Sequence, residues 1–216
     1  MNKQFLVIIV AIVVGLFGVL TLTRHKSSTN GQNSSASSSQ ATNHTIGKGE
    51  KNVTILEYGD FECPACKAYY PIVQEIKKEY GDKIKFQFRH YPLVQIHKNA
   101  FVGSRAAEAA GLQGKFFEMH DLLYEQQDSW SKATDPTTQL TAFATQLGLN
   151  VDQFKTDLAS EAVANSINAD VKAGQAVGVN STPTFLINGK KVDQNPQTLE
   201  DFKKLVDDAI PQANQG

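Results

Sequence analysis

The amino-acid sequence predicts an α/β protein, in which a small mixed sheet carries helices and is interrupted by an inserted block of helices. Two short strand patterns, at residues 53–58 and 83–91, are separated by a stretch whose apolar residues recur at helical spacing. Residues 98–177 show no strand pattern, and a strand, a hairpin signal and a last helix follow them. This order of elements favours one folded domain with a helical insertion.

The bulk composition fits one folded domain with appendages. The chain has 216 residues, of which 41% are hydrophobic, and its formal net charge is −1. Such a balance offers no basic surface of the kind that binds nucleic acid. The two cysteines lie three positions apart, so they cannot form the spread-out framework of a disulfide-stapled fold.

Residues 5–22 are predicted to form a transmembrane helix within an N-terminal membrane anchor, residues 1–26. The run has no charged residue and, at ~1.5 Å per residue, is about as long as the hydrocarbon core of a bilayer is thick. The alternative is a signal peptide, but the run exceeds the ~7–15 residues of a signal peptide's apolar part, and no small-residue cleavage site follows it. Positive charges flank both ends, at Lys3 and at Arg24 and Lys26, so they do not decide the orientation.

Residues 27–43 are predicted to be a flexible linker. The segment is rich in serine and has no charged or large apolar residue, so burial cannot offset the entropy lost on ordering it. A domain tethered in this way could reach partners in or near the membrane.

The first strand and the helix after it surround the two cysteines. Residues 53–58 form a β-branched, mostly apolar run that predicts a buried strand, which Gly59 and Asp60 end. The helix begins at the cysteine motif, where Pro64 suits the first turn because its missing N–H is not needed there. Pro71 should kink the helix, and Gly81 should end it. Its apolar face is formed by Tyr69, Ile72, Val73, Ile76 and Tyr80.

The alternating run at residues 83–91 predicts a second strand, parallel to the first because a helix connects the two. Residues 98–177 predict four or five helices, with caps at Asp135-Pro136 and Asn150. A third strand at 184–187 continues through the hairpin signal Asn188-Gly189 into a returning strand at 190–192. Residues 198–210 have helical spacing and predict the final helix.

Cys63 and Cys66 carry the candidate chemistry. At positions i and i+3 of a helix start, their Cβ atoms lie ~5–6 Å apart, so a modest adjustment of the first turn makes or breaks a disulfide. The unpaired N–H groups and partial positive charge of the helix N-terminus stabilise a thiolate. We expect Cys63, the more exposed of the two, to be the nucleophile, and Cys66 to resolve the mixed disulfide.

Three interpretations of the cysteine pair compete: a redox pair, part of a metal site, or two inert buried cysteines. A zinc site usually needs four ligands, and no paired ligands lie near the motif in the sequence. A copper carrier would need a third ligand, for which His44, His90, His97 and His120 are the candidates. The placement between a strand and a helix, in a chain with no other cysteine, favours redox chemistry.

Three segments together resemble the DsbA-like branch of the thioredoxin superfamily: ILEYGDFECPACK, FRHYPL and GVNSTPTFLINGK. The resemblance covers residues 46–210. It implies a thioredoxin-like fold at residues 44–97 and 178–216, with an inserted helical domain at residues 98–177. It also implies a protein thiol–disulfide oxidoreductase.

The resemblance further implies a set of site residues around Cys63-Pro64-Ala65-Cys66. Pro183 would be cis and lie opposite the cysteines, and the backbone of Thr182 would bind a substrate peptide; the alternative is an ordinary turn before a strand. Glu57 would be a buried acid that exchanges a proton with Cys66, unless it faces solvent. Asp60 and Glu62 are expected to be exposed.

The function that follows is an extracytoplasmic oxidase of cysteine pairs in unfolded or partly folded exported polypeptides. A membrane quinone reductase of the DsbB or vitamin-K-epoxide-reductase type would reoxidise it. Its only redox group would be the Cys63–Cys66 disulfide, with no metal and no nucleic-acid partner. It would be a single-pass protein of the cell membrane, held by residues 5–22 with its folded domain outside, where disulfides persist.

Two other functions stay open on the sequence: an extracytoplasmic disulfide reductase or isomerase, and a metal carrier that uses the CxxC pair. The centre of the motif is Pro-Ala rather than the Pro-His of the strongest oxidants in the family. A missing histidine removes one source of thiolate stabilisation, which leaves the direction of electron flow open.

Overall fold

The structure, a computed structural model, describes residues 40–213, with side chains up to residue 210. The predicted membrane anchor, residues 1–26, and most of the predicted linker lie outside the described residues. Among the residues described, no helix combines the length and the apolar character needed to cross a membrane. The described residues belong to one compact unit, residues 38–216.

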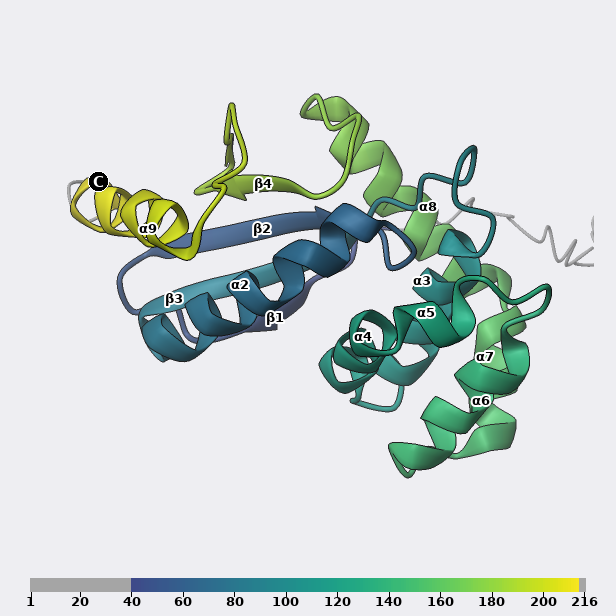
Figure 1. The fold of residues 1–216 in the computed structure, drawn as a ribbon. Coiled ribbons are helices and arrows are strands. Elements are labelled where there is room, and N and C mark those ends of the chain that lie inside the picture. The colour runs from purple at the N-terminus through teal and green to yellow at the C-terminus, as the bar shows by residue number, and fades with distance from the viewer. Residues whose placement is uncertain (1–39, 214–216) are drawn as a thin grey trace, which may run out of the picture. The chain divides into compact units, whose positions relative to one another are not determined.

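Five strands form one mixed sheet in the order β1-β3-β2-β4-β5 (Figure 1). The predicted parallel pairing of the first two long strands is confirmed, as is the antiparallel hairpin at the end. The hairpin turns at Asn188 and Gly189, whose φ angles of 50° and 78° fall in the left-handed region that such a turn requires. The strands are β1 (His44–Ile46), β2 (Val53–Gly59), β3 (Ile84–His90), β4 (Thr184–Ile187) and β5 (Lys190–Lys191).

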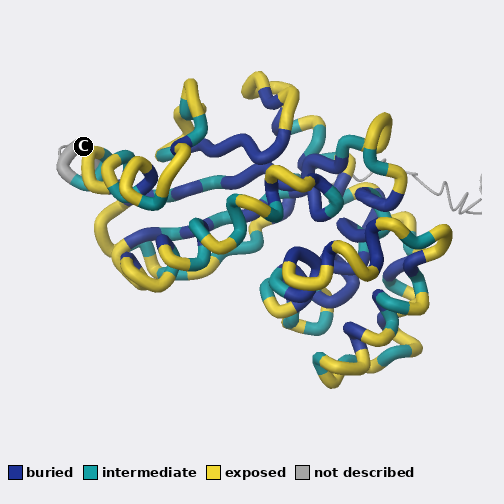
Figure 2. Tube along the Cα trace, viewed as in Figure 1, coloured by how far each residue is buried: buried dark blue, intermediate teal, exposed yellow. Residues whose placement is uncertain are grey.

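Two helices, α2 (Pro64–Tyr80) and α9 (Leu199–Ala213), contact the sheet and each other (Figure 1). Both were predicted, and Pro71 lies inside α2. Their apolar faces enter a common core with the central strands, and Figure 2 shows this buried layer along the sheet. The core around them includes Ile55, Val73, Ile76, Phe86, Phe185, Phe202 and Val206.

Six helices connect β3 to β4, where the sequence predicted four or five. The prediction fell short because α5 has only four residues and because no glycine separates α7 from α8. Asn150 caps α7 as predicted, whereas Pro136 lies at the N-cap of α6 rather than in its first turn. The helices are α3 (Ala100–Gly111), α4 (Phe116–Glu125), α5 (Gln127–Trp130), α6 (Thr137–Gln146), α7 (Val151–Ala159) and α8 (Glu161–Ala176).

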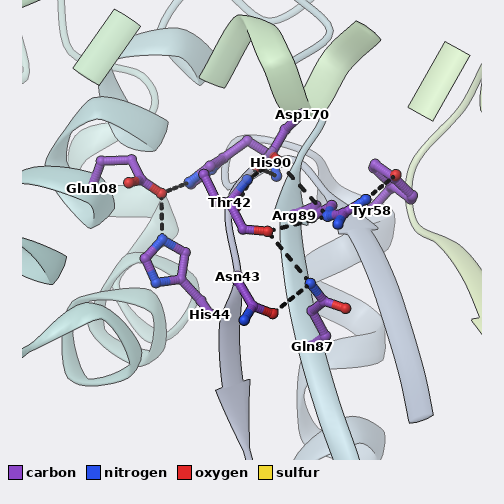
Figure 3. Close-up of polar contacts among 9 residues, drawn as sticks. All are labelled: Thr42, Asn43, His44, Tyr58, Gln87, Arg89, His90, Glu108 and Asp170. Carbon is purple, nitrogen blue, oxygen red and sulfur yellow. Dashed lines mark hydrogen bonds and ion pairs between the residues drawn. The ribbon is translucent and has the colours of Figure 1, made fainter. Parts of the chain in front are cut away.

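Strand β1 was not predicted, because three residues are too few to show an alternating pattern. It pairs antiparallel with β3, and the chain just before it is also anchored. Thr42, which the prediction placed in the flexible linker, is buried and donates to the Asp170 carboxylate of α8 from both its N–H and its hydroxyl, each at 2.6 Å (Figure 3). The ordered chain therefore begins before residue 44. The bounds of the two predicted domains stay predictions.

Candidate active site

Cys63 lies at the N-cap of α2, and Cys66 lies one turn inside the helix. The backbone N–H of Cys63 donates to the Asp60 carbonyl, and the Cys63 carbonyl accepts the first helical bond from Lys67, both at 3.1 Å. Both cysteines are free thiols. Cys63 is 6% exposed and Cys66 is 0% exposed, so only the first sulfur has any access to a substrate.

The wall opposite the cysteines is the segment that enters β4. The Thr182-Pro183 peptide bond is cis, as the resemblance implied. The Cys63 thiol donates to the carbonyl oxygen of Thr182 at 3.5 Å. Residues 119 positions apart in the sequence thus meet across the site.

The two sulfurs differ in acidity. The Cys66 thiol, which donates to the Cys63 sulfur, is the main cause that lowers the pKa of Cys63 to about 5. Burial opposes this shift, while the Thr182 side chain and the backbone N–H groups of Cys66 and Ala65 add to it. Burial, together with the neighbouring sulfur and the charge of Glu57, raises the pKa of Cys66 well above its ordinary value. At neutral pH, the first cysteine is a thiolate and the second is a thiol.

Glu57 is buried on β2, so the alternative that it faces solvent is wrong. Burial raises its pKa to about 8, although the positive charge of Lys77 acts in the opposite direction. Its charge in turn raises the pKa of Cys66. A buried acid that is largely protonated at neutral pH and is coupled to the second cysteine can give or take a proton there.

Asp60 was expected to be exposed, but it is fully buried. Its carboxylate accepts from the backbone N–H of Glu62 at 2.8 Å and of Leu93 at 2.9 Å, and it contacts the His97 ring at 2.7 Å. Glu62 is partly buried and accepts from the Asn99 N–H at 2.6 Å. Both side chains satisfy N–H groups of the loop after β3, which a sequence pattern does not reveal.

A family model described as thioredoxin (Thioredoxin_4) matches residues 39–208. The chain belongs to this thioredoxin family. The match spans the whole sheet, the helical insertion and the cysteine motif, and it confirms the family that the resemblance indicated.

Solved structures with the same fold are DsbA-like members of the thioredoxin superfamily. Oxidised BdbD from Bacillus subtilis is 24% identical, with a TM-score of 0.68 over 81% of this chain and 97% of that one. Alpha-DsbA1 from Wolbachia pipientis is 21% identical, with a TM-score of 0.67 over 80% and 92%. MdbA, a thiol–disulfide oxidoreductase from Actinomyces oris, is 20% identical, with a TM-score of 0.62 over 77% and 87%. These similarities confirm the predicted thioredoxin-like fold with its helical insertion.

Curated relatives of higher identity are longer proteins. The Na(+)/H(+) antiporter NhaA 3 of Salinispora tropica is 38% identical over 170 residues, which are 79% of this chain and 25% of that protein. The Na(+)/H(+) antiporter NhaA 1 of Salinispora arenicola is 41% identical over 148 residues, or 68% and 22%. The thioredoxin-family chain thus spans about a quarter of the length of these relatives.

The helical insertion of this thioredoxin-family chain contributes one polar side chain directly to the cysteine loop. Gln127 of α5 donates from Nε2 to the carbonyl oxygens of Phe61, at 2.8 Å, and of Cys63, at 3.1 Å. Sequence reasoning missed this residue, because a lone glutamine in a helical block carries no signal of its contacts.

Among the described residues, one group of three side chains is arranged as metal ligands could be: His44, His90 and Glu108. Nε2 of each histidine lies next to the same Glu108 oxygen, at 2.6 Å and 2.7 Å (Figure 3). Burial opposes the shift, but the two imidazoles lower the pKa of Glu108 to about 2. Within the described part, the cysteines belong to no such group, and the three residues connect β1 and β3 to α3.

Proposed function

We propose that this DsbA-like thiol–disulfide oxidoreductase oxidises cysteine pairs in exported polypeptides, on the extracytoplasmic side of a membrane. The observation that carries the proposal is the difference in acidity between the two cysteines. A thiolate at Cys63 with a pKa of about 5 stabilises the reduced form of the pair. A pair whose reduced form is stabilised is a strong oxidant when it is oxidised.

The proposed reaction begins with the oxidised Cys63–Cys66 disulfide. A substrate thiolate attacks the Cys63 sulfur, so that a mixed disulfide forms and Cys66 leaves and takes up a proton. A second substrate thiolate then attacks the substrate sulfur of the mixed disulfide and releases the Cys63 thiolate. The substrate gains a disulfide, and the enzyme's disulfide is reduced to the dithiol.

Glu57 is the proposed source of the proton for Cys66. Its pKa of about 8 keeps it largely protonated at neutral pH, and its charge is coupled to that of Cys66. After reoxidation, the same carboxylate would take the proton back. Because both groups are buried, water could not exchange protons with them as freely.

Binding of a substrate peptide is proposed at Thr182 and Pro183. The Thr182 carbonyl lies 3.5 Å from the sulfur of Cys63, the more exposed of the two cysteines. An extended peptide that carries a reactive cysteine could pair with this backbone, as a strand pairs with a sheet edge. Such pairing uses the backbone of the peptide and depends little on its side chains, which suits an enzyme with many unfolded substrates.

The proposed location rests on residues 5–22, whose length and apolar character suit a membrane anchor. A folded domain on the extracytoplasmic side would meet substrates where disulfides persist. A membrane quinone reductase of the DsbB or vitamin-K-epoxide-reductase type would return the dithiol to the disulfide. Ion transport is not proposed, because the chain spans only about a quarter of the antiporters it matches.

The low pKa of Cys63 also favours an oxidase over the alternatives. The Pro-Ala centre lacks a histidine, but the Cys66 thiol, Thr182 and two backbone N–H groups lower the pKa without one. A reductase would need a less stable thiolate. A metal carrier finds no support, because in the described part of the chain the cysteines join no third ligand.

The test is the oxidative refolding of reduced, unfolded ribonuclease by stoichiometric amounts of the oxidised full-length chain. We expect ribonuclease activity to return faster than in the buffer alone, while insulin is reduced slowly. With disulfide-bonded insulin as the substrate, the Cys63 thiolate of a Cys66→Ser variant should attack a substrate disulfide, release one substrate thiol and stay in a mixed disulfide, because no second cysteine resolves it. A Cys63→Ser variant should form none. Rapid insulin reduction without ribonuclease refolding would instead support a reductase.

A further inference from the structure

The short helix α5 of the insertion lies directly on the cysteine loop. The Gln127 side chain is 4% exposed, and its amide group bridges two carbonyl oxygens, at Phe61 and Cys63. These acceptors are more than sixty residues away in the sequence. A fully buried amide that serves two backbone groups of a redox loop fixes the path of that loop.

Other contacts hold the same loop against the insertion. On the solvent side, the Lys67 ammonium pairs with the Asp128 carboxylate at 2.6 Å. On the inner side, Glu62 accepts from the Asn99 N–H, and the Asn99 side chain donates to the Ser131 carbonyl at 2.8 Å. Of these contacts, the hydrogen bond from Gln127 is the one that reaches Cys63 itself.

The bond to the Cys63 carbonyl affects the sulfur through the backbone. This carbonyl also accepts the first N–H of α2, from Lys67, so Gln127 fixes the peptide plane that joins the N-cap to the helix. The orientation of this plane decides how the Cys63 sulfur faces the N–H groups of Ala65 and Cys66.

We propose that Gln127 is a positioning residue of the redox site, through which the helical insertion stabilises the thiolate of Cys63. The insertion then affects the disulfide chemistry directly, because one of its side chains positions Cys63. This inference rests on the proposed function to the extent that Cys63 is the attacking and leaving sulfur.

The test compares two glutamine variants in the full-length, reduced chain. Gln127→Met keeps the length of the side chain and removes the donor. Gln113→Met is the matched control, because the Gln113 side chain also bonds backbone groups, but those of Asn150 and not those of the cysteine loop. The readouts are the pKa of Cys63, from the pH dependence of thiolate absorbance, and the free energy of unfolding.

We expect Gln127→Met to raise the pKa of Cys63 by about half a unit or more. The loss of one or two hydrogen bonds changes the free-energy difference between the thiolate and the thiol by an amount of this order. Gln113→Met should lower stability without moving that pKa. Gln127→Glu should raise the pKa further than Gln127→Met does, because a carboxylate cannot donate and adds a negative charge.

The inference is overturned if Gln127→Met folds and leaves the pKa of Cys63 unchanged. It is also overturned if both Gln127 variants fail to fold while the Gln113 variant folds, because the residue would then be structural only. Failure of the proposed function looks different: the unsubstituted chain itself would show an ordinary Cys63 pKa and would not refold ribonuclease.

Discussion

At the scale of single residues, the site depends on two cysteines that lie one helical turn apart in different surroundings. Cys63 is at the helix N-cap, where a thiol, Thr182 and backbone N–H groups face its sulfur. Cys66 is fully buried and has a carboxyl group among its neighbours. The thiol is therefore unusually acidic at Cys63 and unusually weakly acidic at Cys66, one turn further along the helix.

The first prediction concerns the acidity of Cys63. In the reduced protein, absorbance of the thiolate should rise with pH around a midpoint of about 5. The rate of alkylation by iodoacetamide should fall as the pH is lowered through the same range. In a Cys63→Ser variant, both signals should vanish near pH 5, because the remaining Cys66 is buried and its pKa is raised. A midpoint near 9 would contradict the account.

The second prediction concerns Glu57, whose folded-state pKa of about 8 lies above the ordinary value of 4.5. An acid whose pKa is raised by folding stabilises the fold fully below its ordinary pKa, here about 4.5. This contribution is lost as the pH rises through the folded-state pKa of about 8. Glu57→Gln removes that dependence. Relative to the unsubstituted reduced protein, the variant should therefore gain free energy of unfolding between pH 5 and pH 8, the window that the ordinary and the raised pKa of Glu57 define.

Urea unfolding of both reduced proteins at several pH values measures this difference. Comparison with the variant is needed because Cys63, with its lowered pKa, contributes a dependence of the opposite sign in an overlapping range. Glu79→Gln, a change on the exposed side of α2, serves as a control that should leave the pH profile unchanged. A constant difference between the proteins across this range would show that Glu57 has an ordinary pKa.

At the scale of elements, sequence periodicity predicted the parts that have enough residues to repeat a pattern. The alternation in β3 and the apolar face of α2 were visible because each covers several turns or pleats. The same rule explains what was missed. Strand β1 has three residues and α5 has four, so neither can show a period.

Part of the candidate site could be predicted for a related reason. Cys63, Cys66 and the Thr182-Pro183 segment lie in short sequence motifs that can be identified from the order of their residues alone. Gln127 reaches the site from an element too short to be predicted, through contacts made only in three dimensions. The burial of Asp60 was missed because two of its partners, the Leu93 N–H and the His97 ring, belong to a distant loop.

The third prediction tests the anchor of β1. The fully buried Asp170 carboxylate accepts from the N–H and the hydroxyl of Thr42 and from the N–H of His90, at 3.0 Å (Figure 3). Asp170→Ala leaves these buried donors without an acceptor and should cost about 3 kcal/mol of unfolding free energy. Thr42→Val removes only one donor and should cost about 1 kcal/mol. Equal losses in urea unfolding would contradict this assignment of the anchor.

At the scale of the whole molecule, the helical insertion contacts both the cysteine loop and the sheet. Gln127 bonds the cysteine loop, Glu108 of α3 contacts histidines of β1 and β3, and Asp170 of α8 accepts from the N–H of His90 in β3. The insertion thus contacts both the redox loop and the edge strand of the sheet. The low pKa of Cys63, despite the Pro-Ala centre, comes from the Cys66 thiol, the Thr182 side chain and the backbone N–H groups of Cys66 and Ala65.

The fourth prediction concerns location. Protease added to intact cells, after removal of any cell wall, should digest the folded domain, because the proposal places it outside the membrane. The chain should remain in the membrane fraction after a salt wash, and a variant that lacks residues 2–26 should not reach that fraction. Protection from protease in intact cells, with digestion after lysis, would contradict an extracytoplasmic domain.

The reduction potential of the Cys63–Cys66 pair tests the central claim most directly, because it expresses the stability of the thiolate as a redox equilibrium. It can be measured by equilibration with glutathione buffers and alkylation of the free thiols. The account predicts a potential near the oxidising end of the superfamily, about −120 mV. A value near about −270 mV, typical of a reducing thioredoxin, would contradict it.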